Sequence, residues 1–255
     1  MRTIAIVNQK GGSGKTTTAV NLAATLAEKG KRVLLIDLDA QASASTWYGI
    51  VDVGRGLLDV LTGNGNVSDL VAHTNVLGVS IVPASSWLVG VDRALAGEVG
   101  AESILRGQLA KLKSEEWDYI LMDCPPTLGI LTVNALAAAA EVLVPVEAHV
   151  MALAGLAQLL QTVELVQSRL NPGLTITGIL ACRVDSRTRH GIEVLEELKR
   201  RFGNIVYDTH IRENVKIAEA PSFAVPITVY DSRSRGAEDY RALADAVIHQ
   251  EQERI

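Results

Sequence analysis

The sequence predicts an α/β fold, a doubly wound and mostly parallel sheet with helices on both faces. Short apolar runs alternate with amphipathic stretches along the whole chain of 255 residues, a pattern typical of parallel strands joined by helices. Several runs are apolar without strict alternation, which is expected for strands buried on both faces. The core must be aliphatic, because 48% of the residues are hydrophobic and only 4% are aromatic.

Eight apolar runs are predicted strands: Thr3–Asn8, Arg32–Asp39, Val79–Ala84, Tyr119–Cys124, Glu141–Val146, Ile176–Cys182, Ile205–Thr209 and Ile227–Tyr230. The amphipathic stretches between them predict helices at Thr16–Lys29, Ala101–Lys113, Thr132–Ala140, Gly155–Leu170, Gly191–Phe202 and Ala237–Gln250. The chain has no repeat and no linker, so we expect residues 1–255 to form a single domain.

Composition adds local detail. Gly30 and Gly203 stand where helix C-caps belong, and the alanine-rich stretch Ala135–Ala140 predicts a helix packed closely on the sheet. The segment Gly49–Asn66 is rich in Gly, Asp and Asn. It predicts a loop-rich connection that could serve as a partner surface.

Charge, cysteine content and hydropathy exclude several classes of protein. The net charge is −5, so the surface is not uniformly basic, although a local basic patch is compatible with it. Two cysteines cannot form a disulfide framework, which favours a cytosolic chain. No apolar run approaches the roughly 18 residues of a membrane-spanning helix, and no signal peptide is recognisable. We therefore expect a cytoplasmic protein.

A glycine-rich loop, Asn8–Thr17, lies between the first predicted strand and the first predicted helix. Its glycines allow backbone N–H groups to surround phosphate oxygens at the positive end of the helix dipole. Lys15 can reach the β- and γ-phosphates, and the Thr16 hydroxyl can bind Mg²⁺. A mere connecting turn is the weaker interpretation, because the loop ends in Gly-Lys-Thr.

The loop departs from the standard phosphate-loop pattern. Gln9 stands where that pattern has glycine, and a second lysine, Lys10, precedes Lys15 by five residues. A cation at this place lies at the lip of the loop. It can fold onto its own phosphates or point outward to phosphates bound by another subunit.

The run from Lys10 to Thr17, KGGSGKTT, resembles the deviant Walker A motif of the ParA/MinD ATPases. Segments 33–39 and 120–126 resemble the second acidic motif and the Walker B region of that family. Segments 219–223 and 230–237 resemble the C-terminal part of small Soj-like ParA proteins. The resemblance spans nearly the whole chain and implies a P-loop NTPase fold that hydrolyses ATP with Mg²⁺.

Three aspartates fit this frame. Asp37, Asp39 and Asp123 end predicted strands at the edge where open α/β sheets bind ligands. Carboxylates that converge on a phosphate site repel one another unless Mg²⁺ lies among them, so we expect Asp123 and Thr16 to hold the metal. We expect Asp37 to cap the following helix. By resemblance, Asp39 activates the attacking water and acts with Lys10 and Lys15 in catalysis.

The resemblance also implies the residues that contact the nucleotide: Lys10, Gly11, Gly12, Ser13, Gly14, Lys15, Thr16, Thr17 and Arg183. The family often has proline at the position of Arg212, which leaves the adenine contacts open. Cys124 and Cys182 allow an iron–sulfur interpretation, but buried apolar packing is favoured for both. We expect no metal other than Mg²⁺.

The chain carries a basic segment. Residues 183–235 hold ten Lys and Arg against eight Asp and Glu, whereas residues 1–182 hold 12 against 16. Phosphate contacts need only such a local cluster, although a solvated helix face explains the charge pattern equally well. By resemblance, Arg187 and Lys216 match DNA-contacting positions, and Arg212 lies nearby.

The resulting hypothesis is an ATP-switched partition ATPase associated with the nucleoid. ATP would join two subunits into a homodimer that binds double-stranded DNA without sequence preference. A ParB-like (Spo0J-like) activator would stimulate hydrolysis and release. A ParA-like ATPase that positions a protein cargo is an alternative. A MinD-type membrane switch is less favoured, because the tail 246–255 is acidic and lacks bulky apolar residues on a basic helix face. The chain starts at the first strand, so we expect no operator-binding extension.

Overall fold

The computed structural model describes residues 1–51, 53–113, 115–149 and 152–252. The described residues form one seven-stranded sheet in the order β3-β4-β2-β5-β1-β6-β7, and among these strands only the pair β3–β4 is antiparallel. The strands are β1 (Arg2–Ile6), β2 (Val33–Asp37), β3 (Ala72–His73), β4 (Val79–Val82), β5 (Tyr119–Asp123), β6 (Glu141–Glu147) and β7 (Thr175–Cys182). This arrangement confirms the predicted doubly wound, mostly parallel sheet.

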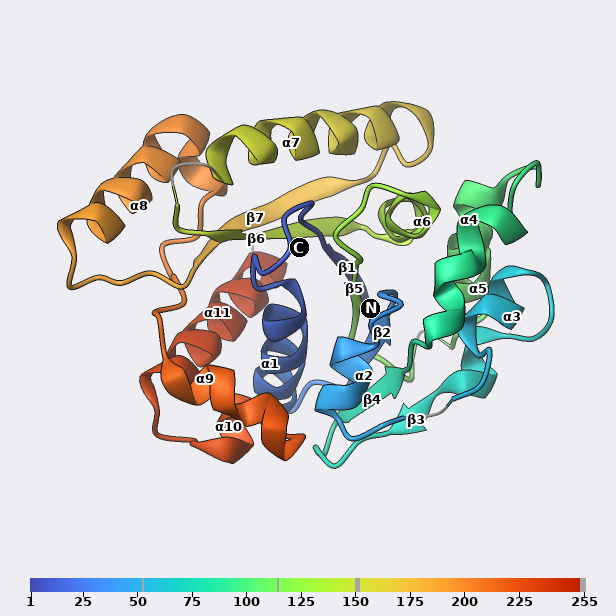
Figure 1. Cartoon of the computed structure of the whole chain (residues 1–255), viewed down its shortest axis with the longest axis horizontal. Helices are drawn as coiled ribbons and strands as arrows, with labels where there is room; N and C mark the ends of the chain where they lie inside the picture. Colours follow the sequence, from blue (N-terminus) through green and yellow to red (C-terminus); the bar gives the residue numbers. More distant parts are fainter. Residues whose placement is uncertain (52, 114, 150–151, 253–255) are drawn as a thin grey trace.

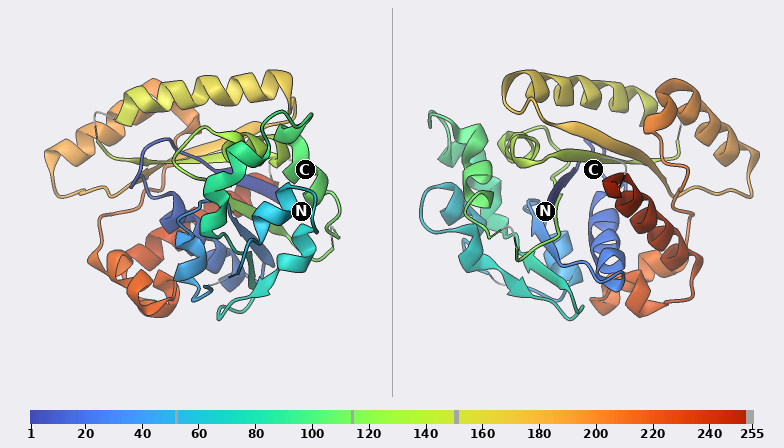
Figure 2. Two further views of the ribbon diagram at one scale, coloured as in Figure 1. Left: turned by 45° about the vertical axis from the view of Figure 1, so that its right-hand side comes forward. Right: turned by 180° about the vertical axis from the view of Figure 1, so that it is seen from behind.

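Helices cover both faces of the sheet (Figures 1 and 2). The α-helices are α1 (Lys15–Glu28), α2 (Ser43–Trp47), α3 (Leu57–Leu61), α4 (Val91–Ala94), α5 (Ile104–Leu109), α6 (Ile130–Ala138), α7 (Ala152–Arg169), α8 (Arg189–Phe202), α9 (Val215–Glu219), α10 (Ile227–Tyr230) and α11 (Arg235–Gln252). Short 3₁₀ turns are η1 (Val67–Leu70), η2 (Ser86–Gly90), η3 (Ala101–Ser103), η4 (Gly203–Ile205) and η5 (Ala220–Phe223).

The core has two halves, one on each face of the sheet. Ile4 and Ile6 pack with α1 and α11 on one face, whereas Ala5 and Val7 belong to the cluster that includes α6 and α7 on the other. Successive side chains of a strand point to opposite faces. A strand buried on both faces therefore needs apolar residues at every position, which explains the continuous apolar runs.

Two predicted strands are wrong. Ile227–Tyr230 forms the helical turn α10, because Pro226 precedes it and the Ile227 N–H donates to the Asn21 side chain on α1 at 2.7 Å. The segment Ile205–Thr209 makes only one isolated bridge, from Val206 to Ile179 of β7.

The glycine-capped helix ends and the alanine-rich helix are confirmed. Gly30 and Gly203 both have positive φ, and α6 is largely buried against the sheet. Part of the segment Gly49–Asn66, predicted to be loop-rich, is helical. It contains α3, whose Leu57, Leu58, Val60 and Leu61 are buried.

Candidate nucleotide-binding site

The site lies where the carboxyl ends of the parallel strands meet. β1 is an interior strand with β5 on one side and β6 on the other, and the chain that leaves its carboxyl end forms the glycine-rich loop. A cavity of 640 Å³ opens there, between this loop and the segment from Ile211 to Pro221. That volume is within the range of small-molecule sites.

Many of the predicted site residues line this cavity: Gly11, Gly12, Gly14, Lys15, Thr16, Thr17, Asp39, Arg183 and Arg212. Cys182, Trp47 and Tyr240 contribute apolar walls. The cavity therefore collects residues from the loop, from the segment that follows β2, and from the end of β7 and the segments after it.

The loop is shaped to receive an anion. Gly12 and Gly14 have φ of 75° and 93°, a left-handed conformation that favours glycine. Gly14 is the N-cap of α1 and supplies no side-chain hydrogen bond to the first turn, so the N–H groups of that turn are available to phosphate oxygens. The buried Ser13 hydroxyl has no hydrogen-bond partner among the described residues.

The two lysines of the loop lie in different environments. Lys15 is 7% exposed, and its ammonium group donates to the Lys10 carbonyl at 3.3 Å. Burial lowers the pKa of Lys15, although Asp123 and Asp39 act in the opposite direction. The Lys10 side chain is 45% exposed and pairs with Glu147 at 2.7 Å. Lys10 is therefore held at the lip of the loop by a carboxylate.

Glu147 is a residue that the sequence reasoning missed. Its carboxylate also accepts an ion pair from Arg183 at 3.4 Å, and the Lys10 hydrogen bond is the main reason that its pKa is lowered. A usable signal was present, because Glu147 directly follows an apolar run whose end belongs to the ligand-binding edge.

Two aspartates lie side by side beneath the loop. Asp37 and Asp123 are register partners on β2 and β5, and both are fully buried. Asp37 accepts hydrogen bonds from the backbone and hydroxyl of Ser45 in α2, which matches the expected helix-capping role. Burial raises the pKa of Asp37 to about 6.

Asp123 is the unsatisfied member of this pair. Neither of its carboxylate oxygens has a hydrogen-bond partner among the described residues. Burial, and then the charge of Asp37, raise its pKa well above the usual range, while Thr16 and Lys15 oppose the shift. An orphaned carboxylate beside a hydroxyl fits a hard cation such as Mg²⁺. A bound Mg²⁺ would neutralise charge on the phosphates, held by Asp123 and Thr16.

Asp39 faces the cavity and is only partly buried. Its backbone N–H donates to Asp37 at 3.1 Å, and its carboxylate accepts from the Gln41 N–H at 3.0 Å. Asp37 thus fixes the backbone of Asp39, and the second carboxylate oxygen of Asp39 accepts no hydrogen bond from the described residues.

The far wall of the cavity begins at Arg183, which has φ of 55°. A non-glycine residue in this conformation is strained by about 1–3 kcal/mol, and such strain clusters at functional sites. Cys182 lies beneath the loop, with its Sγ 3.4 Å from the position that a Cβ on Gly14 would take. Cys124 and Cys182 are both buried and belong to opposite faces of the sheet, as expected for packing residues.

The three predicted DNA contacts differ in how exposed they are and in how firmly a carboxylate already pairs with them. Arg187 and Lys216 are exposed and form surface ion pairs with Asp185 and Glu219. Arg212 instead donates several hydrogen bonds to Asp239, with a shortest distance of 2.6 Å.

The loop, the buried lysine and the orphaned carboxylate define a P-loop ATPase with a nucleotide and Mg²⁺ site at the carboxyl edge of its sheet. The model of the family AAA_31, an AAA domain, matches residues 1–176. The sporulation initiation inhibitor protein Soj of Bacillus subtilis (strain 168) is 48% identical, over 96% of this chain and 97% of its own length.

Other relatives agree with this assignment. The chromosome partitioning protein ParA of Caulobacter vibrioides (strain NA1000 / CB15N) is 42% identical over 100% of this chain and 96% of its own. A solved structure, cobyrinic acid a,c-diamide synthase from Mycobacterium smegmatis with a bound ATP analogue and magnesium, has a TM-score of 0.88 and 34% identity over 100% of this chain and 97% of that one. The chain belongs to the ParA/MinD-type ATPases, close to the Soj-like partition proteins, and it hydrolyses ATP.

Proposed function

We propose that residues 1–255 form a single domain and that this domain is a DNA partition ATPase switched by ATP. In the ATP state it forms a homodimer that binds double-stranded DNA without sequence preference and associates with the nucleoid. A ParB-like activator stimulates hydrolysis and release. The observation that supports this function best is the exposed Lys10 beside a complete phosphate loop, in a chain 48% identical to Soj and 42% identical to ParA.

The proposed division of labour follows from burial. Lys15 is buried among phosphate-binding N–H groups and holds the β- and γ-phosphates of its own nucleotide. Thr16 and Asp123 hold Mg²⁺. Asp39, with an oxygen free to face the cavity, positions the attacking water.

Dimerisation is proposed from the lip of the loop. Gly11 and Gly12 are exposed, and a Cβ built on either of them meets nothing within 4 Å. The chain itself therefore leaves room there for a second backbone. Lys10 would exchange Glu147 for the phosphates held by the second subunit. Gly11→Val should block this approach, because a branched side chain would fill the space.

Two alternatives are less well supported. A ParA-like ATPase that positions a protein cargo would have the same nucleotide-binding residues, so only the DNA-binding assay distinguishes it from a DNA partition ATPase. A MinD-type membrane switch needs a free apolar helix face, but Leu243, Ala244 and Val247 of α11 are fully buried against the core. Residues 253–255 of the tail lie outside the described residues. In the part of the chain that the structure describes, no helix has the length and apolar character to cross a bilayer.

The test uses three variants and one DNA assay. Lys15→Ala should abolish binding of a fluorescent ATP analogue. Lys10→Ala should retain that binding but lose stimulated turnover. Asp39→Ala should accumulate as an ATP-bound dimer in size-exclusion light scattering. Wild-type protein with a non-hydrolysable analogue should bind unrelated duplexes equally. Absence of DNA binding, with dimerisation intact, would favour the protein-cargo alternative.

A further inference from the structure

The basic segment 183–235 divides into paired and unpaired cations. Eight of its ten basic side chains form ion pairs within the chain: Arg183, Arg187, Arg189, Lys199, Arg200, Arg201, Arg212 and Lys216. The other two are Arg233 and Arg235. Both are exposed, and neither forms an ion pair with any described residue.

The pairing matters because a phosphate must compete with the carboxylate that is already present. Exposed pairs such as Arg187–Asp185 are worth about 0–1 kcal/mol, so they can open, but the carboxylate remains beside the phosphate and repels it. Arg212 is a different case. Its partner Asp239 has only 10% of its side chain exposed, and opening the pair would strand a nearly buried charge.

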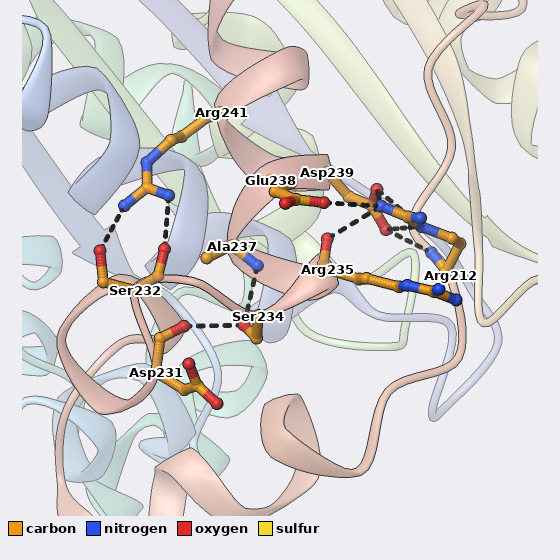
Figure 3. Close-up of polar contacts among 9 residues, drawn as sticks. All are labelled: Arg212, Asp231, Ser232, Ser234, Arg235, Ala237, Glu238, Asp239 and Arg241. Carbon is orange, nitrogen blue, oxygen red and sulfur yellow. Dashed lines mark hydrogen bonds and ion pairs between the residues drawn. The ribbon is translucent and has the colours of Figure 1, made fainter.

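The backbone of the segment that carries Arg233 and Arg235 is held by hydrogen bonds that use neither of their side chains. Figure 3 shows those made by Ser234, Arg212 and Arg241. The Ser234 hydroxyl accepts the Ala237 N–H at 3.2 Å and donates to the Asp231 carbonyl at 2.8 Å. The Arg212 guanidinium donates a hydrogen bond to the Arg235 carbonyl at 3.3 Å and forms its ion pair with Asp239. Both free guanidinium groups are therefore presented from an ordered backbone.

Two further contacts complete this environment. Arg241 donates to the Ser232 carbonyl at 2.7 Å. A Cβ on Gly236 would lie 2.7 Å from the Ile217 side chain, so the start of α11 packs tightly on α9, the helix that carries Lys216.

The carboxylates near these arginines are already engaged. Asp231 accepts the backbone N–H of Arg233 at 3.3 Å. Glu238 and Asp239 both face Arg212. The excess positive charge of this corner therefore resides on the two free arginines.

We propose that Arg233 and Arg235 are the principal phosphate contacts of the DNA-binding surface, and that Arg212 is not a contact. The inference rests on the proposed DNA binding and goes beyond it by assigning the contacts to the turn that starts α11. Because Arg233 and Arg235 do not line the nucleotide cavity, their loss should leave nucleotide binding intact.

The experiment compares two double variants of the full chain with a non-hydrolysable ATP analogue. Arg233→Gln/Arg235→Gln removes the free cations. Arg189→Gln/Arg200→Gln removes the same charge from two paired, exposed positions. Fluorescence polarisation with two unrelated duplexes gives affinity across a salt series, and analogue binding and light scattering check the dimer.

We expect the free-cation variant to lose four contacts per dimer, which lowers the salt slope by about 3.6 at about 0.9 per contact. Between about 50 and 200 mM salt, the DNA affinity of the wild-type protein should therefore fall by a factor roughly 150 times larger than the factor for the variant. The paired-cation variant should keep nearly the wild-type slope.

Two results would overturn this placement while leaving the proposed function intact. One is DNA binding by wild-type protein together with an unchanged slope in the Arg233→Gln/Arg235→Gln variant. The other is an equal loss in both variants, which would mean that only net charge matters. If wild-type protein binds no DNA as a dimer, the proposed function fails, and this inference fails with it.

Discussion

Replacing Arg212 with alanine is expected to destabilise the fold by about 2 kcal/mol. Breaking a buried ion pair by removing one partner typically costs about 3–5 kcal/mol, because the other charge is left uncompensated. Two features of the pair reduce this figure. The Arg212 side chain is 29% exposed, so water can partly screen Asp239 in its absence. Asp239 also keeps the hydrogen bond from the backbone N–H of residue 212, at 2.9 Å.

Thermal unfolding without nucleotide measures this effect. At this chain length about 2 kcal/mol corresponds to a fall in Tm of about 4–8 °C. The double variant Arg212→Ala/Asp239→Ala should lose less stability than the two single variants lose in sum, because the second substitution removes the carboxylate that the first leaves unpaired. Lys216→Ala, which breaks an exposed pair, should cost less than about 0.5 kcal/mol. A Tm for Arg212→Ala within about 1 °C of wild type, or additive losses in the cycle, would refute this reasoning.

Three other predictions follow from single contacts. Glu147→Gln releases the two cations that Glu147 neutralises beside the cavity, so ADP should bind up to about fivefold tighter by calorimetry; weaker binding would contradict this. Gly178→Ala places a Cβ 2.3 Å from the Tyr207 ring and should cost about 2 kcal/mol in chemical denaturation, whereas Gly107→Ala, which meets nothing within 4 Å, should not destabilise the fold. Hydrogen bonds from a neighbouring arginine lower the pKa of Asp118 to about 2. The Asp118 carboxylate therefore contributes below about 1 kcal/mol to the free energy of unfolding at this exposure. This contribution is present above about pH 4 and lost as the pH falls toward 2. Urea titrations of Asp118→Asn and wild type should therefore differ above about pH 4 and converge toward pH 2.

The elements that the sequence predicted well are those whose signals are local. β2 and β5 were placed within two residues at each end, because strands covered on both faces must be apolar at every position. The glycine-rich loop was found because its residues are consecutive and its context, strand then helix, is part of the motif. Asp123 was found for the same reason.

The errors arose where a distant residue decides the local structure. The run Ile227–Tyr230 has strand-like β-branched residues, but its first N–H is satisfied by Asn21, 206 positions earlier in the chain. Tertiary contacts of this kind override weak propensities in short segments. The ion pairs of Lys10 with Glu147 and of Arg212 with Asp239 were missed because no spacing in the sequence brings those partners together.

The same long-range pairs connect the cavity with the proposed DNA surface. Arg212 lines the nucleotide cavity and holds both Asp239 and the Arg235 carbonyl on α11. The next residues, Glu213 and Asn214, also line the cavity, and Asn214 caps α9 through the Lys216 N–H. A nucleotide that displaces this wall must therefore move the start of α11 with it, or else break a nearly buried ion pair at a cost of about 2 kcal/mol. Displacement as a unit would be the less costly response, and the free arginines would then move together with this wall of the cavity.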